Sequence, residues 1–190
     1  NLEFRDGHLY AEDFRIDLIY KRVLTSELVD EMGIDNPIIR AIKARAVMMT
    51  NSMSCKLLAK KASFALLSDE ANSHLFDEAQ LAAIRTHIPW TRRVKERTTQ
   101  FHEVPVDLVP FASKYKERFV IKPNDEYGGK GVLLGWETSQ QEWDARLQEG
   151  IKGESYVIQE RVDLIVRDFP AYINGRLDIS PRYIDANPYV

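Results

Sequence analysis

The spacing of apolar positions divides the chain into short segments of strand and helix type. Residues 2–10 alternate between apolar and polar side chains around Asp6-Gly7, a pair that is typical of a two-residue hairpin turn. Asn174-Gly175 has the same character within residues 169–177, where we expect one further hairpin. Other apolar runs, rich in β-branched and aromatic residues, predict strands over residues 14–23, 47–51, 119–121, 132–134 and 156–162.

Helices are expected where the apolar period lengthens to three or four residues and a capping residue stands in front. Asn36 followed by Pro37 marks one such start, because asparagine caps the first turn and proline fits its first position. Ser139, three residues before Glu142, marks another as a capping box. The expected helices span residues 26–33, 37–45, 54–67, 78–88, 106–116 and 140–150.

Composition and charge exclude some classes of protein. The chain has 190 residues, of which 44% are hydrophobic, enough for a sizeable core in one or two domains. Its 26 basic and 29 acidic residues give a net charge of −3, which argues against nucleic acid or a membrane surface as partner. No apolar run approaches the roughly 18 residues of a transmembrane helix and no signal segment opens the chain, so we expect a cytoplasmic location. The oligomeric state is not indicated.

The single cysteine and the two ends of the chain carry less information. Cys55 excludes an intrachain disulfide and offers no metal-ligand cluster. The chain begins at Asn1 rather than Met and ends in mid-pattern at Val190, so we expect it to be a fragment of a longer protein.

The most informative stretch is the loop between the strands predicted over residues 119–121 and 132–134. Gly128, Gly129 and Gly131 surround Lys130, and Lys122 ends the first strand. Glycines let the backbone approach a ligand closely and present N–H donors, which together with a lysine suits a polyphosphate. Hairpin loops also use glycine simply to turn, so the loop alone leaves both interpretations open. It is not a Walker A loop, because the spacing and the residue after the lysine differ.

The longer order of elements is more specific. Strand, lysine, glycine-rich loop, strand, helix, strand and Gln159-Glu160 follow one another. At these residues the chain resembles the ATP-grasp superfamily, in particular its circularly permuted branch of the glutathionylspermidine-synthase type. The resemblance implies that Lys122 reaches the α-phosphate and adenine side, that the loop covers the β- and γ-phosphates, and that backbone groups at Glu160 and Val162 read adenine. The ATP-binding residues that it implies are Lys122, Gly128, Gly129, Lys130, Gly131, Gln159, Glu160 and Val162.

The same resemblance implies an α+β fold of ATP-grasp type, with mixed and antiparallel sheets, flanking helices and a circularly permuted order. Residues 1–104 would form the N-terminal part, and residues 105–190 the nucleotide-binding subdomain. The implied reaction joins a small-molecule or peptide carboxylate to an amine through an acylphosphate, with ATP and Mg²⁺. Two alternatives remain: a non-catalytic nucleotide-binding module that regulates or scaffolds a partner, and a small-molecule phosphotransferase.

Catalytic and metal residues are less clearly marked. Asp17 falls inside a predicted apolar strand, where a lone carboxylate is costly, so it needs a partner, either a cation such as Arg22 or a metal. The resemblance favours a metal site at Asp17, and Asn51 is a second candidate ligand because amide oxygens accept hard cations. The expected catalytic residues are Lys130 and Arg22.

Two further stretches each have two interpretations. The basic run Trp90–Arg97 is either a solvated connector or supplies an arginine that fixes a carboxylate or phosphate of the substrate. Asp185-x-Asn187 resembles a Mg²⁺-binding signature, but it follows Glu160 too closely for the elements that must intervene, so we expect only hairpin residues there.

Overall fold

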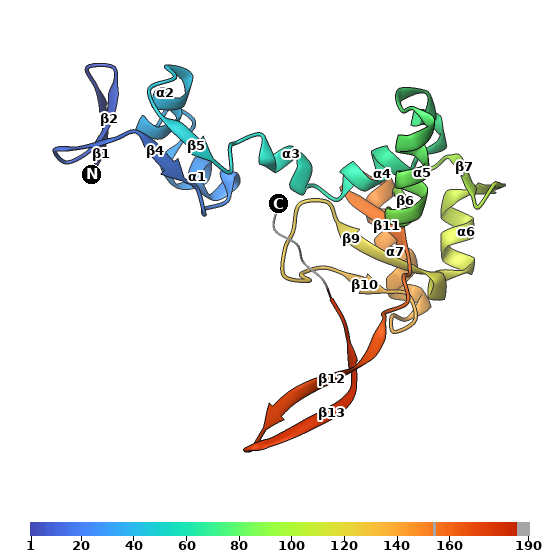
Figure 1. Cartoon of the computed structure of the whole chain (residues 1–190). Helices are drawn as coiled ribbons and strands as arrows, with labels where there is room; N and C mark the ends of the chain where they lie inside the picture. Colours follow the sequence, from blue (N-terminus) through green and yellow to red (C-terminus); the bar gives the residue numbers. More distant parts are fainter. Residues whose placement is uncertain (154, 186–190) are drawn as a thin grey trace. The chain divides into compact units, whose positions relative to one another are not determined.

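The computed structural model describes residues 1–153 and 155–185, and it has an α+β fold with several small sheets (Figure 1). Two compact units, Asn1–Ser63 and Phe64–Val190, make up the chain. The expected boundary after residue 104 therefore lies elsewhere, because β6 (Thr91–Arg93) pairs with β11 (Tyr156–Glu160) in the second unit. Within the described part of the chain, no helix has both the length and the apolar character needed to cross a membrane.

The first unit begins with a three-stranded antiparallel sheet of β1 (Leu2–Arg5), β2 (His8–Ala11) and β3 (Phe14–Ile16). The predicted hairpin is confirmed: Asp6 and Gly7 form its turn with φ of 50° and 75°, the left-handed backbone that this turn requires. Leu9 on β2 is fully buried, and α2 (Pro37–Lys43) packs against β1 and β2.

A second small sheet in this unit pairs β4 (Leu18–Tyr20) in parallel with β5 (Met48–Thr50). The crossover between them carries α1 (Thr25–Met32), which ends at Gly33, and α2, which Asn36 caps by accepting from the N–H of Ile39. The single strand predicted over residues 14–23 is wrong. It breaks at Asp17, which is exposed and whose carbonyl accepts the N–H of Met48, so β3 and β4 belong to different sheets.

The segment around the unit boundary is helical but interrupted. The single helix predicted over residues 54–67 is two, α3 (Cys55–Ala59) and α4 (Ala62–Ser68), because Lys60 adopts extended backbone with ψ of 131°. A 3-10 turn, η1 (Glu70–Leu75), follows. Asp77 and Gln80 then form a capping box at the start of α5 (Glu78–His87), which is the helix predicted over residues 78–88.

A four-stranded antiparallel sheet organises the second unit, in the order β10-β9-β11-β6. Its strands β9 (Phe119–Pro123) and β10 (Leu133–Leu134) flank the glycine-rich loop, and β11 lies between β9 and β6. The register sets Lys122 opposite Val157 and Val157 opposite Arg93, in one row across three strands. The neighbouring row on the same face is Val120, Gln159 and Thr91. We call this side, with Thr91, Arg93, Val120, Lys122, Val157 and Gln159, the lysine face.

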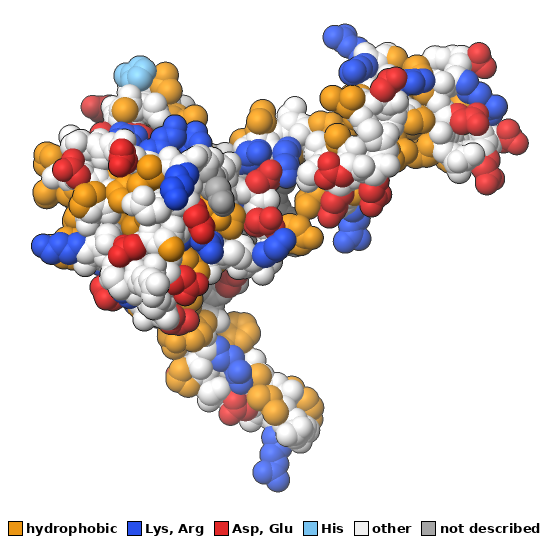
Figure 2. Space-filling view, turned by 180° about the vertical axis from the view of Figure 1, so that it is seen from behind, with side chains coloured by type: hydrophobic (Ala, Val, Ile, Leu, Met, Phe, Trp, Pro, Cys, Tyr) orange, Lys and Arg blue, Asp and Glu red, His pale blue; other side chains and the backbone are white. Residues whose placement is uncertain are grey.

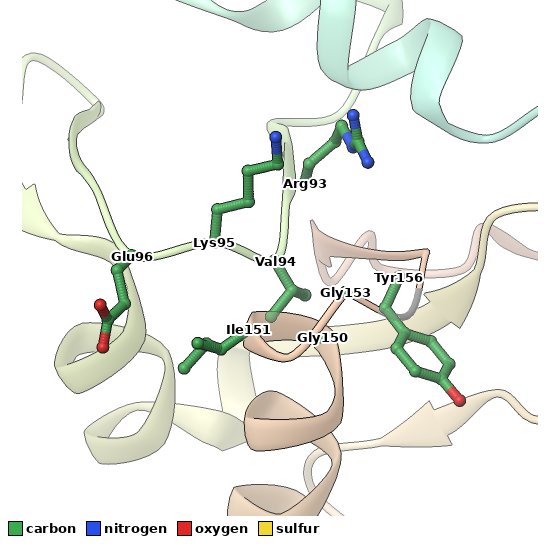
Figure 3. Close-up of a pocket in the computed structure, with 8 residues that line it drawn as sticks. All are labelled: Arg93, Val94, Lys95, Glu96, Gly150, Ile151, Gly153 and Tyr156. Carbon is green, nitrogen blue, oxygen red and sulfur yellow. The ribbon is translucent and has the colours of Figure 1, made fainter.

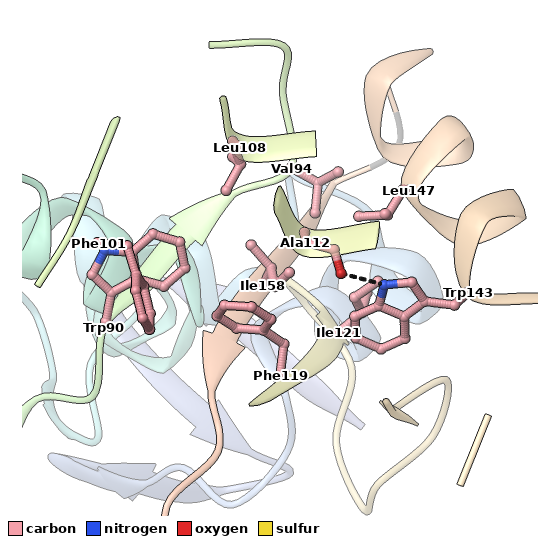
Figure 4. Close-up of a cluster of buried hydrophobic side chains, with 10 residues drawn as sticks. All are labelled: Trp90, Val94, Phe101, Leu108, Ala112, Phe119, Ile121, Trp143, Leu147 and Ile158. Atoms are coloured by element: carbon pink, nitrogen blue, oxygen red, sulfur yellow. Dashed lines mark hydrogen bonds between the residues drawn. The ribbon is translucent and has the colours of Figure 1, made fainter. Parts of the chain in front are cut away.

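The opposite side of the sheet forms the hydrophobic core, which two helices cover (Figure 4). These are α6 (Leu108–Lys114) and α7 (Gln140–Ile151), and Ser139 caps α7. A hairpin of β7 (Thr98–Phe101) and β8 (Val104–Asp107) precedes α6, and η2 (Lys116–Arg118) leads from α6 into β9. Trp143 on α7 is fully buried and its Nε1–H donates to the carbonyl of Ala112 over 3.0 Å. The rings of Trp90 and Phe101 meet edge to face, with centroids 5.1 Å apart.

The described chain ends with a long hairpin of β12 (Val166–Ile173) and β13 (Arg176–Tyr183), which is a two-stranded sheet. Asn174 and Gly175 form its turn with φ of 49° and 79°, which confirms the prediction. Hydrophobic side chains are exposed along it (Figure 2), and Tyr172, Leu177 and Ile179 share one face. Each strand also contains one proline, Pro170 and Pro181 respectively.

Replacement of Trp143 by alanine tests the packing of α7 on the sheet. Trp143→Ala is expected to lower the free energy of unfolding by roughly 3–5 kcal/mol, because it opens a cavity in the core and leaves the Ala112 carbonyl without its donor. Chemical denaturation measures this loss. Trp136→Ala, which truncates a half-buried tryptophan outside the core, is the matched control and is expected to cost clearly less. Equal losses in the two variants would contradict the packing described.

Candidate functional site

Lys122 lies on the lysine face with its amine fixed by a neighbouring strand. Its Nζ donates to Oε1 of Gln159 over 2.7 Å, and Nε2 of Gln159 donates to Oγ1 of Thr91 over 2.9 Å. Thr91 is fully buried and Gln159 is 7% exposed, whereas Lys122 is half-buried. The sheet therefore brings together Lys122 and Gln159, two of the residues expected to bind ATP.

The glycine-rich loop begins after Pro123, the last residue of β9, and requires its glycines. Gly128, Gly129 and Gly131 have φ of 64°, 75° and 70°, in the left-handed region that side chains disfavour. A Cβ at Gly131 would also lie 2.8 Å from Cγ of Pro123, too close for any other residue without displacement. These glycines therefore shape the loop, which is consistent with both interpretations offered by the sequence, a turn and a phosphate cradle.

Lys130, at the tip of this loop, lies toward the other side of the sheet. It lines a cavity of about 480 Å³ together with Arg146 of α7 and Tyr156, which belong to the helix-covered side. Its Nζ is 3.6 Å from Glu126, and its side chain is 78% exposed. Lys122 is not among the residues that line this cavity, although only the loop separates the two lysines along the chain.

The predicted hinge, Glu160 and Val162, lies at the end of β11. The N–H of Glu160 donates to the carbonyl of Trp90 over 2.8 Å, so this group is engaged within the sheet. The carboxylate of Glu160 lies 2.8 Å from Nε2 of His102 and 3.7 Å from Arg118. Val162 is 61% exposed and follows the strand, so it is the accessible member of the hinge.

The expected metal ligands Asp17 and Asn51 lie in the first unit, at opposite ends of the parallel pair β4 and β5. Asp17 precedes β4, and Asn51 follows β5, where its Nδ2 donates to the carbonyl of Lys21 over 3.2 Å. Asp17 pairs with Arg15 at 2.8 Å rather than with Arg22, which lies beyond the far end of β4. The two expected ligands therefore do not lie together. Of the two partners considered for Asp17, a cation is present, but it is Arg15 and not Arg22.

No group of three or more His, Cys, Asp or Glu side chains suited to a metal ion exists among residues 1–153 and 155–185. Of the two expected catalytic residues, Arg22 is exposed and belongs to the first unit, whereas Lys130 belongs to the second. Their joint use in one site stays a prediction. Of the pair Asp185 and Asn187, Asn187 lies outside the described residues.

A second cavity, of about 250 Å³, lies beside the end of α7 (Figure 3). Val94 approaches Gly150 there so closely that a Cβ on Gly150 would lie 2.5 Å from the valine, so the position needs glycine. Arg93 and Lys95 point away from this contact in Figure 3. The charged residues that line this cavity are Arg93, Lys95 and Glu96, and Arg93 belongs also to the lysine face.

The basic run Trp90–Arg97 is not a solvated connector, because its side chains alternate across β6. Arg92 is 2% exposed and lies on the core side, where it stacks on the ring of Trp90 with 4.6 Å between guanidinium and centroid. It donates to Oγ1 of Thr99 over 2.7 Å and to the carbonyl of Ser68 over 2.8 Å, and it pairs with the carboxylate of Glu70. Arg92 therefore binds a carboxylate, as one of the two interpretations of the run expects, but this carboxylate is Glu70 of the protein and not a substrate.

A second arginine completes this buried network. Arg97 donates to Asp69 through both terminal nitrogens, and one of these bonds measures 3.1 Å. Burial disfavours the charged form of Asp69, but the hydrogen bond from Arg97, the N–H of Ala71 and the charge of Arg92 outweigh it and hold its pKa below the ordinary value. For Glu70 burial is again outweighed, by hydrogen bonds from Thr99 and Gln100 and by Arg92, so its pKa is lowered too.

Two residues of the lysine face, Thr91 and Arg93, were not predicted as single site residues. The sequence does contain a signal for them, because side chains in a strand point alternately to opposite faces. In the stretch Trp90–Val94 this alternation places Thr91 and Arg93 on one face and the other three residues on the opposite face. Arg93 is exposed at one end of the row whose other end is Lys122. It is therefore the member of the basic run that is free of the Arg92 network and is placed beside the candidate site.

No family model and no curated protein sequence matches the chain. Among the solved structures that match it is D-alanyl-alanine synthetase A from Vibrio cholerae, with 15% sequence identity and a TM-score of 0.41. The match covers 98% of this chain and 52% of that chain, so the chain spans about half the length of this neighbour. At this score the likeness establishes neither a family nor an activity.

The lowered pKa values of Asp69 and Glu70 predict a loss of stability in acid. A carboxylate whose folded pKa lies below its unfolded value, about 4, stabilises the protein fully above that value and progressively less as the pH falls through it. Glu70→Gln is therefore expected to cost roughly 3 kcal/mol at pH 7, because it leaves the buried Arg92 without its counterion, and the gap to wild type should narrow below about pH 5.

Denaturation of both proteins at intervals between pH 7 and pH 3 measures this gap. Glu96→Gln, which removes an exposed carboxylate outside the network, is the matched control and should follow the wild type throughout. A gap that stays constant down to pH 3 would show that the Glu70 carboxylate is not what Arg92 requires.

Proposed function

We propose that this chain is the ATP-binding part of a carboxylate-amine ligase of the circularly permuted ATP-grasp type. The observation that carries the proposal is the position of Lys122. It is the penultimate residue of the central strand β9, lies on the lysine face with Gln159 of the paired strand, and precedes a loop whose glycines have left-handed backbone. Strand, lysine, glycine-rich loop and paired strand occur in the order on which the resemblance to ATP-grasp proteins rests.

The charges of the lysine face suit a polyphosphate. Lys122 and Arg93 stand at the two ends of one row, separated by the β11 residue Val157. Adjacent strands lie about 4.8 Å apart, so the two Cα atoms are about 10 Å apart. Two long cationic side chains at this spacing can each donate a charge-assisted hydrogen bond to a different phosphate of one nucleotide.

The proposal also requires the glycine-rich loop to move. Lys130 lies at the helix-covered side beside Glu126, and it reaches phosphates bound at Lys122 only after the loop has closed over the lysine face. Gly128, Gly129 and Gly131 provide the backbone freedom for such a change. A closed loop would also exclude water from an activated carboxylate, which water would otherwise hydrolyse.

ATP supplies the phosphoryl group that activates the carboxylate, so that an amine can attack the carboxyl carbon and displace phosphate. The role of this chain is positioning and neutralisation of charge, because phosphoryl transfer needs little covalent participation by the protein. The residues expected to hold Mg²⁺ do not fit that role as they stand, since Asp17 and Asn51 lie at opposite ends of a strand pair. No step is therefore assigned to a metal held by these residues.

A second candidate is a nucleotide-binding module that regulates or scaffolds a partner without ligation. The absence of a metal-ligand cluster among residues 1–153 and 155–185 favours it. Release of phosphate from ATP that depends on an added amine, measured with the full-length protein and a panel of acids, would distinguish the ligase from this module. A stable phosphorylated product would instead indicate a small-molecule phosphotransferase.

Removal of the lysine amines tests the nucleotide site. Lys122→Ala and Lys130→Ala are each expected to weaken binding of ATP with Mg²⁺ by about 10- to 100-fold, the value of a hydrogen bond between charged groups. Isothermal titration calorimetry of this chain measures the affinity. Lys114→Ala removes the same charge from the last turn of α6, on the other side of the sheet, and should bind as the wild type does. Wild-type affinity in both test variants would refute the assignment.

A further inference from the structure

We infer that Thr91 is a positioning residue of the candidate ATP site, which acts on Lys122 through the side chain of Gln159. The inference rests on the proposed function, and it assigns a role to a residue that touches neither the loop nor Lys122. Thr91 lies on β6, Gln159 on β11 and Lys122 on β9, so the three side chains cross three adjacent strands of the lysine face.

The donors and acceptors in the hydrogen bonds that join Thr91, Gln159 and Lys122 can be assigned from the structure. Oγ1 of Thr91 donates its proton to the carbonyl of Pro89 over 2.8 Å, and it accepts from Nε2 of Gln159 over 2.9 Å. A hydroxyl has only one proton, so Oγ1 of Thr91 can offer Gln159 only an acceptor. The amide nitrogen of Gln159 must therefore face Thr91, and its oxygen faces the amine of Lys122 over 2.7 Å.

The reversed amide would be unfavourable at both ends. Two acceptor oxygens would then meet at Thr91, and the amide N–H groups would meet the ammonium of Lys122, which only donates. Thr91 is fully buried and Gln159 is 7% exposed, so water cannot readily take the place of a lost partner. The threonine thus selects one orientation of the amide.

Two side chains hold the backbone of Thr91 in place. Its N–H donates to Oγ of Ser68 over 3.0 Å, and its carbonyl accepts from Nη1 of Arg92 over 2.8 Å. The relay therefore starts from a fixed point in the protein and ends at the amine of Lys122. Lys122 pays less conformational entropy on binding ATP when Gln159 already restrains its amine.

A double-mutant cycle separates this role from a merely structural one. Thr91→Val keeps the shape of the side chain but removes the acceptor for Gln159, and it is expected to weaken ATP binding by about tenfold. In a Lys122→Ala background the same substitution should change the affinity by less than about twofold, because the residue through which it acts is gone. Thr91→Ser, which restores the hydroxyl, should bind nearly as tightly as wild type. Calorimetry with ATP and Mg²⁺, or displacement of a fluorescent nucleotide for the weak binders, gives the affinities of the whole chain.

Each outcome decides the inference. Equal losses in the two backgrounds would show that Thr91 acts on the fold, and they would overturn it. Weak binding by Lys122→Ala with unchanged binding by Thr91→Val would overturn it and leave the proposed function intact. Unchanged binding by Lys122→Ala would refute the proposed function, and the inference with it. Melting curves check that each variant is folded, and Thr91→Ala takes the place of Thr91→Val if the valine is not accommodated.

Discussion

The pairing of β11 with both β9 and β6 is the constraint on which the second unit depends. It joins residues 157–159 to residues 120–122 and 91–93, which are far apart in the sequence. Because strand side chains alternate, this one register decides which residues enter the core and which line the lysine face. A slip by one residue in β6 would place Arg92 in the row of Val157 and Lys122 and turn Arg93 toward the core. The candidate site and the stability of the unit therefore have a common origin.

The Arg92 network shows how a charge can enforce that register. The guanidinium is buried, so it is tolerated only where Glu70, Thr99 and the ring of Trp90 are in reach. In any other register this charge would lack its partners. The network thus raises the free energy of the other registers of β6 more than it lowers that of the native register. Hydrophobic contacts such as those of Trp143 supply the favourable free energy of folding.

Local signals in the sequence predicted local structure. The turns at Asp6-Gly7 and Asn174-Gly175 and the cap at Asn36 are confirmed, because each depends on neighbours within a few residues. The break at Asp17 was missed because a partner 31 residues away, Met48, takes its carbonyl. In the site, the nearness of Lys122 and Gln159 followed from the order of elements. Thr91 did not, since 68 residues separate it from Gln159 and only the completed sheet makes them neighbours.

The two prolines of the hairpin have a consequence for its behaviour in a crowded solution. The N–H of Ile184 donates to the carbonyl of Ile165, so by the register Pro170 and Pro181 occupy positions whose backbone nitrogens point outward, one on each free edge. A proline nitrogen cannot donate a hydrogen bond, so neither edge offers an unbroken ladder to another strand. The hairpin can thus expose apolar side chains while its edges resist growth into a larger sheet, which is how natural proteins avoid aggregation.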